Sequence, residues 1–418
     1  MRLERFIDMI QAGRCPDGKL EIQGTYNFVV KDKHLDALLE ALRQPNNVRS
    51  IFFESNLSPS SIQKMAQFLE NNVQIESFSL WNTSVGMNKT NENLEYFIPV
   101  IQNNTTLKRL HLNRIGAQYT ESSSCSFFEA LKKNHSLEIL SLWDNFFQGP
   151  KIAQQIADVI TINTSLKTLH LRSHCFNTEE LGFIISSLSS NKVLEELDIS
   201  SWYRHKIKDE GAILVANELA KNIHLKSLTL FNSDITSRGA KALADGLRPN
   251  SYLTHLELGS NPIAQEGVLA LADALTQNHT LQKLAISTYA ANNEGVTAFA
   301  NMLEANPSLI EFDYGSFYTL GDGMDKLRIE MGLTRNKITL LKQQEGSEKE
   351  LQTSKQKLHQ LQINYEQGIT PANFSDFLDR RFNKFRERRV GGCCAFPFAG
   401  ALVSEVEDNT PIQSAGPK

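Results

Sequence analysis

The side chains of this sequence that could do chemistry favour binding over catalysis. Its three tryptophans are Trp81, Trp143 and Trp202, and none of them lies in a stretch with the helical spacing of apolar residues. Exposed tryptophan and arginine side chains are the usual anchors of protein–protein interfaces. The sequence therefore predicts a protein partner, bound near Trp81, Trp143 and Arg172.

Catalytic and cofactor-binding patterns are missing from the sequence. It has no glycine-rich phosphate loop, no Cys/His set at metal-ligand spacing and no serine nucleophile elbow. Neighbouring acids such as Glu195 and Glu196 point to opposite faces of a strand, so they cannot share a proton. His111 and His170 could approach each other, but no Cys or acid accompanies them. The sequence thus predicts no enzyme activity, no metal site and no cofactor.

One short unit positions the candidate side chains, and it is clearest over residues 253–278. Leu256 and Leu258 are two residues apart, so they point the same way from a short strand. Val268 and Leu271 follow at helical spacing. One strand and one helix cannot bury their apolar faces alone, so the unit must stack on copies of itself.

The copies are present, at spacings of 27 to 32 residues. The residue that opens each copy, called position one below, is apolar in all ten: Val48, Ile75, Leu107, Leu137, Leu166, Leu194, Leu225, Leu253, Leu281 and Leu309. An asparagine precedes position one by three residues in nine copies: Asn72, Asn104, Asn134, Asn163, Asn191, Asn222, Asn250, Asn278 and Asn306. Asparagine tolerates the left-handed conformation in which helices often end, so it marks the predicted end of each helix.

This pattern resembles the leucine-rich repeat, and a length of about 28 residues with a full helix is similar to the ribonuclease-inhibitor-like subclass. The resemblance covers roughly residues 20–317. It implies an α/β fold, a curved solenoid with a parallel β-sheet on the concave face and α-helices on the convex face. A C-terminal helical extension follows the repeats. Such a chain is expected to be a monomer.

The family places an asparagine at position nine, where it ties neighbouring turns together. In this chain it is present only at Asn56, Asn145 and Asn261. Thr83 and Ser233 could partly replace it. Four other residues at this position could not, so their turns are expected to be irregular: Ile115, Trp202, Tyr289 and Phe317.

The chain divides into five predicted regions. These are an N-terminal cap (1–47), about ten repeats (48–317), a C-terminal cap helix (318–342), a helical extension (343–390) and a flexible tail with Gly and Cys (391–418). A strand at 19–22 opens the cap. In the extension, Leu351, Leu358 and Tyr365 are seven residues apart, which fits either a short coiled coil or one solvated helix lying on the cap.

The resemblance also implies which side chains lie on the concave face, because positions three, five, seven and eight flank the core leucines. Nine of them are candidate partner-binding residues: Trp81, Arg109, His111, Trp143, His170, Arg172, Asp198, Phe231 and Glu257. Neighbouring strands are about 4.8 Å apart, so Trp81 and Trp143, two repeats apart, are expected roughly 10 Å from each other. The alternative is that both tryptophans fold over the turns and complete the stack.

Charge is distributed unevenly along this predicted face. Basic residues lie in repeats three to five: Arg109, His111, Arg114, His170 and Arg172. Acidic residues lie in repeats six to ten: Glu196, Asp198, Glu257, Glu311 and Asp313. Such a gradient would fix the orientation of a partner more than it would raise its affinity. The alternative is that these are ordinary polar residues of a solvated sheet face, without a role in binding.

A second function hypothesis comes from the same repeat subclass. Activators of small GTPases of the nuclear-transport class share it, and some use Asn and Arg residues of the repeats. By that resemblance, Arg109, Arg114 or Arg172 would accelerate GTP hydrolysis by a partner GTPase.

Composition points to a reducing compartment. The net charge of −4 gives no indication of nucleic-acid binding, and no apolar run approaches the roughly 18 residues of a membrane-spanning helix. Acids interrupt the N-terminal stretch where a signal peptide would be apolar, and the five cysteines form no disulfide framework. A cytosolic location is therefore expected. The irregular repeats and many Asn and Lys residues resemble leucine-rich repeat effectors that intracellular bacteria deliver into host cells.

The tail carries a separate prediction. Residues 371–390 are expected to form a helix with five apolar side chains on one face and a charge of 6 − 3 = +3. Cys393 and Cys394 follow and are candidate sites of lipidation. The segment 371–398 would then associate peripherally with a membrane surface. The competing interpretation packs its phenylalanines against the last repeat.

Overall fold

The computed structural model of the chain describes residues 3–23, 32–55, 57–81, 93–116, 120–201, 206–286, 293–314, 323–344 and 347–368. All of them belong to one compact unit, residues 1–370. The predictions made for the segment 371–398, including Cys393 and Cys394, fall outside the described residues. The same holds for Asn56, Thr83, Trp202, Tyr289 and Phe317 at position nine.

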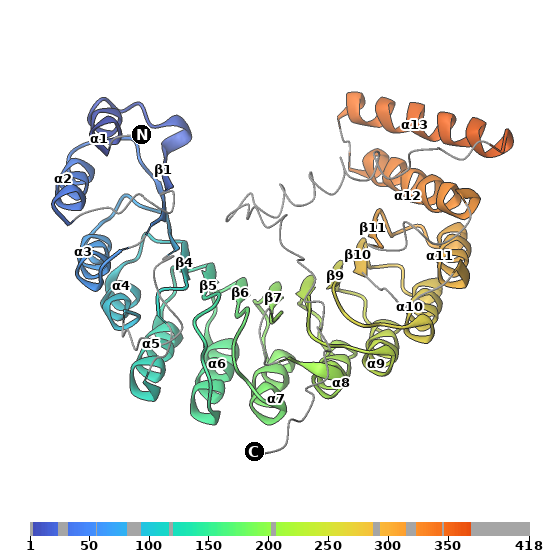
Figure 1. The fold of residues 1–418 in the computed structure, drawn as a ribbon, viewed down its shortest axis with the longest axis horizontal. Helices are drawn as coiled ribbons and strands as arrows, with labels where there is room; N and C mark the ends of the chain where they lie inside the picture. Colours follow the sequence, from blue (N-terminus) through green and yellow to red (C-terminus); the bar gives the residue numbers. More distant parts are fainter. Residues whose placement is uncertain are drawn as a thin grey trace, which may run out of the picture. The chain divides into compact units, whose positions relative to one another are not determined.

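The sheet of the described residues is parallel and has 11 strands in strict chain order (Figure 1). The strands are β1 (Lys19–Gln23), β2 (Ser50–Glu54), β3 (Ser77–Trp81), β4 (Arg109–Asn113), β5 (Ile139–Ser141), β6 (Thr168–His170), β7 (Glu196–Asp198), β8 (Ser227–Thr229), β9 (His255–Leu258), β10 (Lys283–Ile286) and β11 (Glu311–Asp313). The register advances by one repeat at each step, so Leu228 pairs with Leu256 and Leu256 with Leu284. Position four of every repeat therefore lies in one continuous row, as the leucine spacing predicts.

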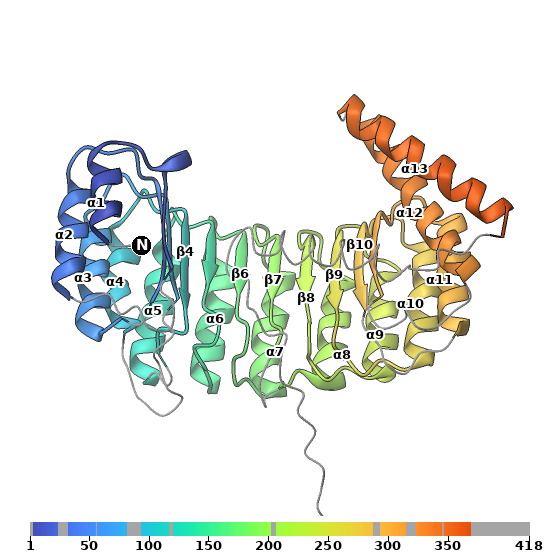
Figure 2. The same ribbon diagram turned by 45° about the horizontal axis from the view of Figure 1, so that its top comes forward.

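A helix follows almost every strand and returns the chain to the start of the next one. The helices are α1 (Leu3–Gln11), α2 (Asp32–Arg43), α3 (Pro59–Glu70), α4 (Ile98–Asn103), α5 (Glu121–Lys133), α6 (Pro150–Ile162), α7 (Thr178–Ser186), α8 (Lys208–Leu219), α9 (Ser237–Leu247), α10 (Gln265–Gln277), α11 (Asn293–Ala305), α12 (Gly323–Gln343) and α13 (Glu348–Glu366). Within residues 1–370 the strands line the inner side of a curve and the helices its outer side (Figures 1 and 2). The predicted α/β solenoid with a parallel sheet is confirmed.

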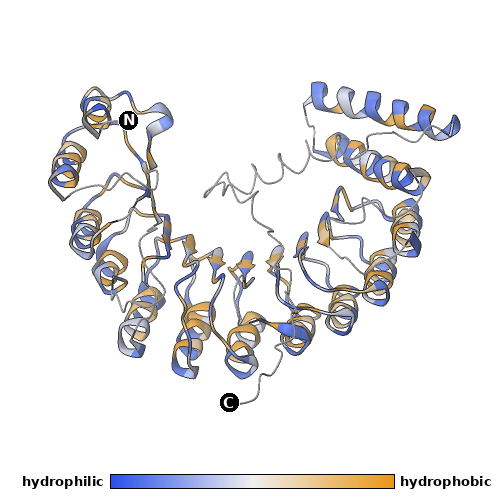
Figure 3. Cartoon of the chain, viewed as in Figure 1, coloured by the Kyte–Doolittle hydropathy of each residue, from blue (hydrophilic) through white to orange (hydrophobic). Residues whose placement is uncertain are grey.

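The core lies between the sheet and the helices. Leu256 and Leu258 of β9 point into it with 2% and 0% of their surface exposed, and Leu271 of α10 faces them with 0%. The same apolar residues recur in each repeat, so one hydrophobic cluster runs through the stack. In Figure 3 the apolar colour accordingly gathers on the facing sides of strands and helices. Burial of this kind contributes about 25 cal/mol per Å² of apolar surface, which is why the units are stable only as a stack.

The asparagine before each repeat ends a helix as predicted, but not in the predicted backbone conformation. Asn104, Asn134 and Asn163 are extended, with φ between −80° and −69°. Their side chains are the reason for their recurrence. Asn250 Oδ1 accepts the backbone N–H groups of Tyr252 and Leu253, at 3.0 and 2.8 Å.

The amide nitrogen of the same asparagine reaches across to the preceding repeat. Asn250 Nδ2 donates to the carbonyl oxygens of Leu219 at 2.7 Å and Asn222 at 3.1 Å. Asn278 repeats this arrangement one unit later, donating to the carbonyls of Leu247 and of Asn250. We name this row of side chains the asparagine ladder. It satisfies carbonyl groups that the end of each helix leaves unpaired.

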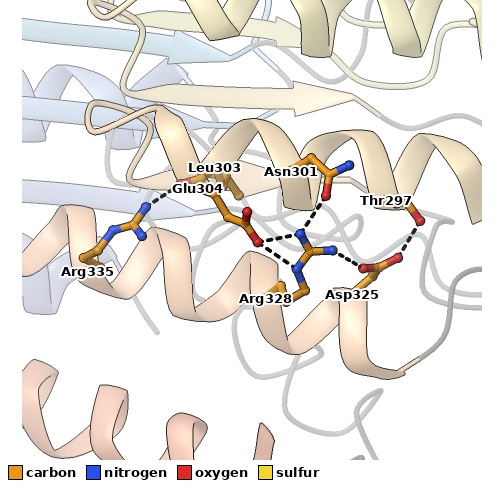
Figure 4. Close-up of polar contacts among 7 residues, drawn as sticks. All are labelled: Thr297, Asn301, Leu303, Glu304, Asp325, Arg328 and Arg335. Atoms are coloured by element: carbon orange, nitrogen blue, oxygen red, sulfur yellow. Dashed lines mark hydrogen bonds and ion pairs between the residues drawn. The ribbon is translucent and has the colours of Figure 1, made fainter.

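Helix α12 closes the C-terminal end of the stack (Figure 4). Arg328 lies between two helices: its Nε donates to Glu304 of α11 at 3.0 Å and its Nη1 to Asp325 of α12 at 2.7 Å. Asn336 Nδ2 donates to the carbonyls of Asn306 and Leu309, at 2.8 and 2.9 Å. Asn336 thus extends the asparagine ladder one step beyond the last repeat.

Helix α13 packs along α12. Leu361 is 9% exposed, and Lys357 Nζ lies 2.7 Å from Glu330 Oε2 of α12, whose side chain is 2% exposed. Over the part of the extension that the structure describes, α13 is one helix lying on α12. In the part of the chain that the structure describes, no helix is long and apolar enough to cross a bilayer.

Candidate functional site

The candidate residues lie on the inner face of the sheet because strand side chains alternate. Positions four and six point to the helices, so positions five and seven point away from them. Trp81 ends β3, Trp143 follows β5 by two residues, and His170 ends β6. Arg172 follows β6 and Phe231 follows β8 at the same position of their repeats. We name these five residues the aromatic–basic cluster.

The two tryptophans are closer than the strand spacing suggests. The centroids of the Trp81 and Trp143 rings are 6.2 Å apart and the rings are nearly perpendicular, at 89°. The expected separation of roughly 10 Å is therefore wrong, because it counted only the distance between backbones. The repeat between them carries Asn113, a short side chain that is fully buried. Asn113 Oδ1 accepts the Trp143 backbone N–H at 3.0 Å, which leaves room for the rings to close above it.

Arg172 is enclosed by aromatic rings. Its guanidinium carbon lies 5.0 Å from the centroid of the Trp143 ring and 6.0 Å from that of Phe231. The His170 ring lies 5.8 Å from the Trp143 ring, and its Nε2 is 3.0 Å from Glu196 Oε1. Cation–π contacts of this kind contribute about 0.5 to 2 kcal/mol and hold the guanidinium in a fixed orientation.

Burial divides the candidates into three groups. Trp81 is only 5% exposed, so it acts as a wall against which Trp143 packs. Trp143, Arg172 and Phe231 are half-buried, as are His111 and His170. Arg109 is exposed. The indole nitrogen of Trp143 is buried without a hydrogen-bond partner among the described residues, and a buried donor of this kind calls for a water or another molecule to accept from it.

Two ionisable groups near the cluster have shifted pKa values. Burial, with contributions from His170 and Arg109, lowers the pKa of His111 to about 4, so its ring is neutral at pH 7. Burial raises the pKa of the Asp144 carboxyl, against the opposing effects of its Ser173 hydrogen bond and nearby arginines.

Two of the candidate acids are directed into their own turns. Asp198 is 7% exposed, and its Oδ1 accepts the Ser200 backbone N–H at 2.9 Å and the Ser200 hydroxyl. Glu257 is 6% exposed, and its Oε1 accepts the Gly259 backbone N–H at 2.9 Å. Both carboxylates therefore stabilise the chain reversal after a strand.

The charge gradient is partly balanced within the face. His170 and Glu196 pair at its boundary, and the His170 hydrogen bond lowers the pKa of Glu196. Lys283 lies 3.4 Å from Glu311 further along. No group of three or more His, Cys, Asp and Glu residues that could hold a metal ion occurs within the described ranges.

A comparison with family models finds a match to part of the chain. The model described as the TMOD/LMOD leucine-rich domain matches residues 204–338, less than half of the chain. Together with the registered strands, this match decides the fold. The chain has a leucine-rich repeat fold.

Two solved structures resemble parts of this leucine-rich repeat protein. The leiomodin-1 actin-binding site 2 is 26% identical, with a TM-score of 0.30 over 36% of this chain and 86% of that chain. The tropomodulin C-terminal domain of Caenorhabditis elegans is 14% identical, with a TM-score of 0.33 over 47% of this chain and 99% of that chain. TM-scores this low carry no argument about function. The search of curated proteins finds no match.

The structure also reveals a residue of the leucine-rich repeats that sequence reasoning missed. His174 is at position nine of the fifth repeat, counted from Leu166, where the family places asparagine. Its Nδ1 accepts the backbone N–H of Phe147 at 3.1 Å, so a histidine ties these two turns. The sequence already shows a histidine at position nine of this repeat. Only the geometry shows that its imidazole can replace the asparagine amide.

Proposed function

We propose that this leucine-rich repeat protein is a protein-binding module whose partner docks on the inner face of the sheet at the aromatic–basic cluster. The observation that carries the proposal is the enclosure of Arg172 by Trp143 and Phe231. Side chains of these types form the centres of most protein interfaces. Their mutual packing fixes them before a partner arrives, which reduces the entropy lost on binding.

Four members of the cluster and two nearby acids have definite roles in the proposal. Trp143, Arg172 and Phe231 contact the partner, since each keeps part of its surface exposed. Trp81 is buried and holds the Trp143 ring upright. Asp198 and Glu257 stay with their own turns and maintain the shape of the face.

Charge selects the orientation of the partner. Arg109 is exposed at one side of the cluster, and the acids Glu311 and Asp313 lie half-buried in the last repeat. An acidic part of the partner would lie toward repeats three to five and a basic part toward repeat ten. Attraction of this kind mainly raises the association rate and weakens at high salt.

The test compares Trp143→Ala and Arg172→Ala with the intact chain. Partners are captured from cell extract, identified, purified and titrated by calorimetry. Each substitution is expected to weaken binding by a factor of about 30 or more, corresponding to about 2 kcal/mol at a hot spot. Arg238→Ala is the matched control, because Arg238 is exposed on the outer helix α9.

A negative result would be clear. If circular dichroism shows both variants folded and they bind the purified partner as tightly as the intact chain, the binding site lies elsewhere.

GTPase activation is a separate, finer hypothesis. Arg109 is exposed and could reach a GTPase, whereas Arg172 is held between aromatic rings. The GTPase hypothesis predicts that a small GTPase hydrolyses GTP faster when the chain is present. This acceleration should disappear when Arg109, Arg114 or Arg172 is changed to alanine. An unchanged hydrolysis rate across a panel of GTPases would leave the binding module alone.

Delivery into a host cytosol as a bacterial effector, a monomeric state and membrane association of the tail also stay predictions. Cys393→Ser/Cys394→Ser should release the chain from the membrane fraction of eukaryotic cells. A wild-type chain found wholly in the soluble fraction would contradict the tail hypothesis.

A further inference from the structure

His174 holds together two neighbouring turns that asparagine holds elsewhere in the stack. Asn261, at the same position in the eighth repeat, uses both ends of its amide. Its Oδ1 accepts the backbone N–H groups of Ser233 and Ile235, and its Nδ2 donates to the Leu230 carbonyl at 2.9 Å. An amide does this at any pH between acid and alkaline extremes, because it does not titrate there.

The contact between His174 and Phe147, which we call the histidine joint, lies in an apolar environment. His174 is 7% exposed, and its ring lies 4.8 Å from the Phe147 ring and 5.8 Å from the Phe176 ring, measured between centroids. Phe128 of α5 lies behind Phe147 at 5.3 Å. Besides the bond from Phe147 N–H to Nδ1, the Cys175 N–H donates to the Phe147 carbonyl at 2.9 Å. Two hydrogen bonds therefore tie repeats four and five next to these aromatic rings.

The direction of the Phe147 bond determines the protonation state of His174. A backbone N–H can only donate, so Nδ1 must be the unprotonated nitrogen of the ring. The proton of the neutral ring is then on Nε2, which is buried and has no hydrogen-bond partner in the described part of the chain. A second proton would have to bind Nδ1, where it would face the Phe147 N–H. The protonated ring therefore cannot keep this bond.

We infer that His174 makes the connection between the fourth and fifth repeats an acid-sensitive joint, which opens when the imidazole becomes protonated. The open joint separates the turn that contains Phe147 from the turn that contains His174 and Cys175. Joints made by Asn145 and Asn261 lack this response, because amides take up no proton in this pH range.

No neighbouring charge offsets the cost of a buried imidazolium. Titratable groups on the surrounding elements include Asp144 in the preceding turn, Cys175 beside the ring, Glu180 on α7 and Cys125 on α5. Burial alone lowers the pKa of His174, to about 3, and none of these four groups contributes. Its ordinary value is 6.5, so opening is favoured progressively as the pH falls below 6.5.

The joint belongs to the same two turns as the aromatic–basic cluster. Asp144 N–H donates to the Arg172 carbonyl and Leu142 N–H to the His170 carbonyl, both at 3.0 Å. These bonds connect the joint to Arg172, so we expect an opening that also breaks them to move Arg172 away from Trp143. If the proposed function is right, partner affinity then falls with acid; this consequence rests on the proposed function, whereas the joint itself does not.

Hydrogen exchange followed by mass spectrometry tests the joint in the full chain. Protection of the Phe147 amide, corrected for the intrinsic rate, is expected to fall about 30-fold between pH 7 and pH 5, because the open state binds the proton. In the same molecule, the Ser233 and Ile235 amides on Asn261 serve as an internal reference and should keep their protection.

Two variants complete the test. His174→Asn restores the family residue and should abolish the acid response at Phe147, while Asn261→His should create one at Ser233 and Ile235. The inference is overturned if wild-type protection at Phe147 does not change relative to the reference, or if His174→Asn keeps the full response. A Phe147 response without any change of partner affinity would overturn only the consequence for binding.

Discussion

At the scale of single residues, the asparagine ladder shows how one side chain serves two neighbouring repeats. Asn250 is 5% exposed and makes four hydrogen bonds to backbone groups, two within its own repeat and two to the preceding one. Alanine at this position would leave two N–H groups and two carbonyl groups without their partners. Each buried group left unpaired costs about 1 to 3 kcal/mol.

We therefore expect Asn250→Ala to lower the free energy of unfolding by roughly 3 kcal/mol or more. Urea denaturation followed by circular dichroism measures this change. Asn217→Ala is the control, because Asn217 is an exposed residue of α8 and its loss should change stability by less than about 0.5 kcal/mol. Equal effects of the two substitutions would show that the ladder contributes little.

The sequence predicted the positions of these asparagines but not what they do. Spacing shows that Asn250 recurs in step with Leu253, and helix ends were the obvious explanation. The hydrogen bonds to Leu219 and Asn222 become visible only when neighbouring repeats lie in register. His174 was missed for the same reason. Its role depends on the Phe147 amide, 27 residues away.

His111 should make stability depend on pH. Its folded pKa is about 4, below the ordinary 6.5, so the unfolded chain binds the proton more readily. This contribution to stability is complete above pH 6.5 and is lost as the pH falls toward 4. Between pH 7 and pH 5 the loss should be about 2 kcal/mol.

This pH dependence is checked by measuring the free energy of unfolding at pH 7 and pH 5. The measurement is made on the intact chain and on His111→Gln. The difference between the two proteins should shrink by that amount at pH 5. Asn217→Ala changes an exposed residue of α8 that carries no titratable group, so it serves as the control. A His111→Gln protein with an unchanged pH dependence would disprove the assignment.

At the scale of elements, close helix packing sets where glycine is required. In α9, a Cβ on Gly246 would lie 2.5 Å from the Ala216 carbonyl oxygen of α8, which is too short for any real contact. In α7, a Cβ on Gly182 would meet only the Leu214 side chain, at 3.9 Å. The same substitution should therefore have opposite effects in the two helices.

Gly246→Ala is expected to destabilise the protein by roughly 1 to 3 kcal/mol, because α8 and α9 must move apart. Gly182→Ala should be neutral or stabilising by up to about 1 kcal/mol, since alanine favours the helix. Urea unfolding of both variants provides the measurement. Destabilisation of similar size at both positions would contradict this account of the packing.

The strands were easier to predict than the side chains they carry. Leucine spacing established the parallel register, because position four of each repeat must join one row. It could not establish that Trp81 and Trp143 lean together, since ring orientation depends on the small Asn113 between them. The burial of Trp81 likewise follows from packing with neighbours that no sequence pattern specifies.

At the scale of the whole repeat stack, stability depends on nearest neighbours, so the ends need separate protection. Helix α12 supplies it at the C-terminal end. Leu327, Ile329 and Leu333 are at most 1% exposed, and Asn336 continues the asparagine ladder. Helix α13 covers α12 rather than a repeat, and of its described residues only Ser354 and Leu361 are buried.

Two truncations distinguish the roles of these helices. A chain of residues 1–344 keeps α12 and should remain folded and monodisperse. A chain of residues 1–322 lacks α12, which uncovers Leu303 of α11; Leu303 is 0% exposed in the intact structure and packs against Gly332 of α12. Exposed apolar surface of this extent drives association, so the shorter chain should aggregate. Size-exclusion chromatography with light scattering separates the outcomes. A monodisperse, cooperatively unfolding 1–322 chain would show that α11 and β11 close the stack without α12, and that the contacts of Arg328 and Asn336 are dispensable.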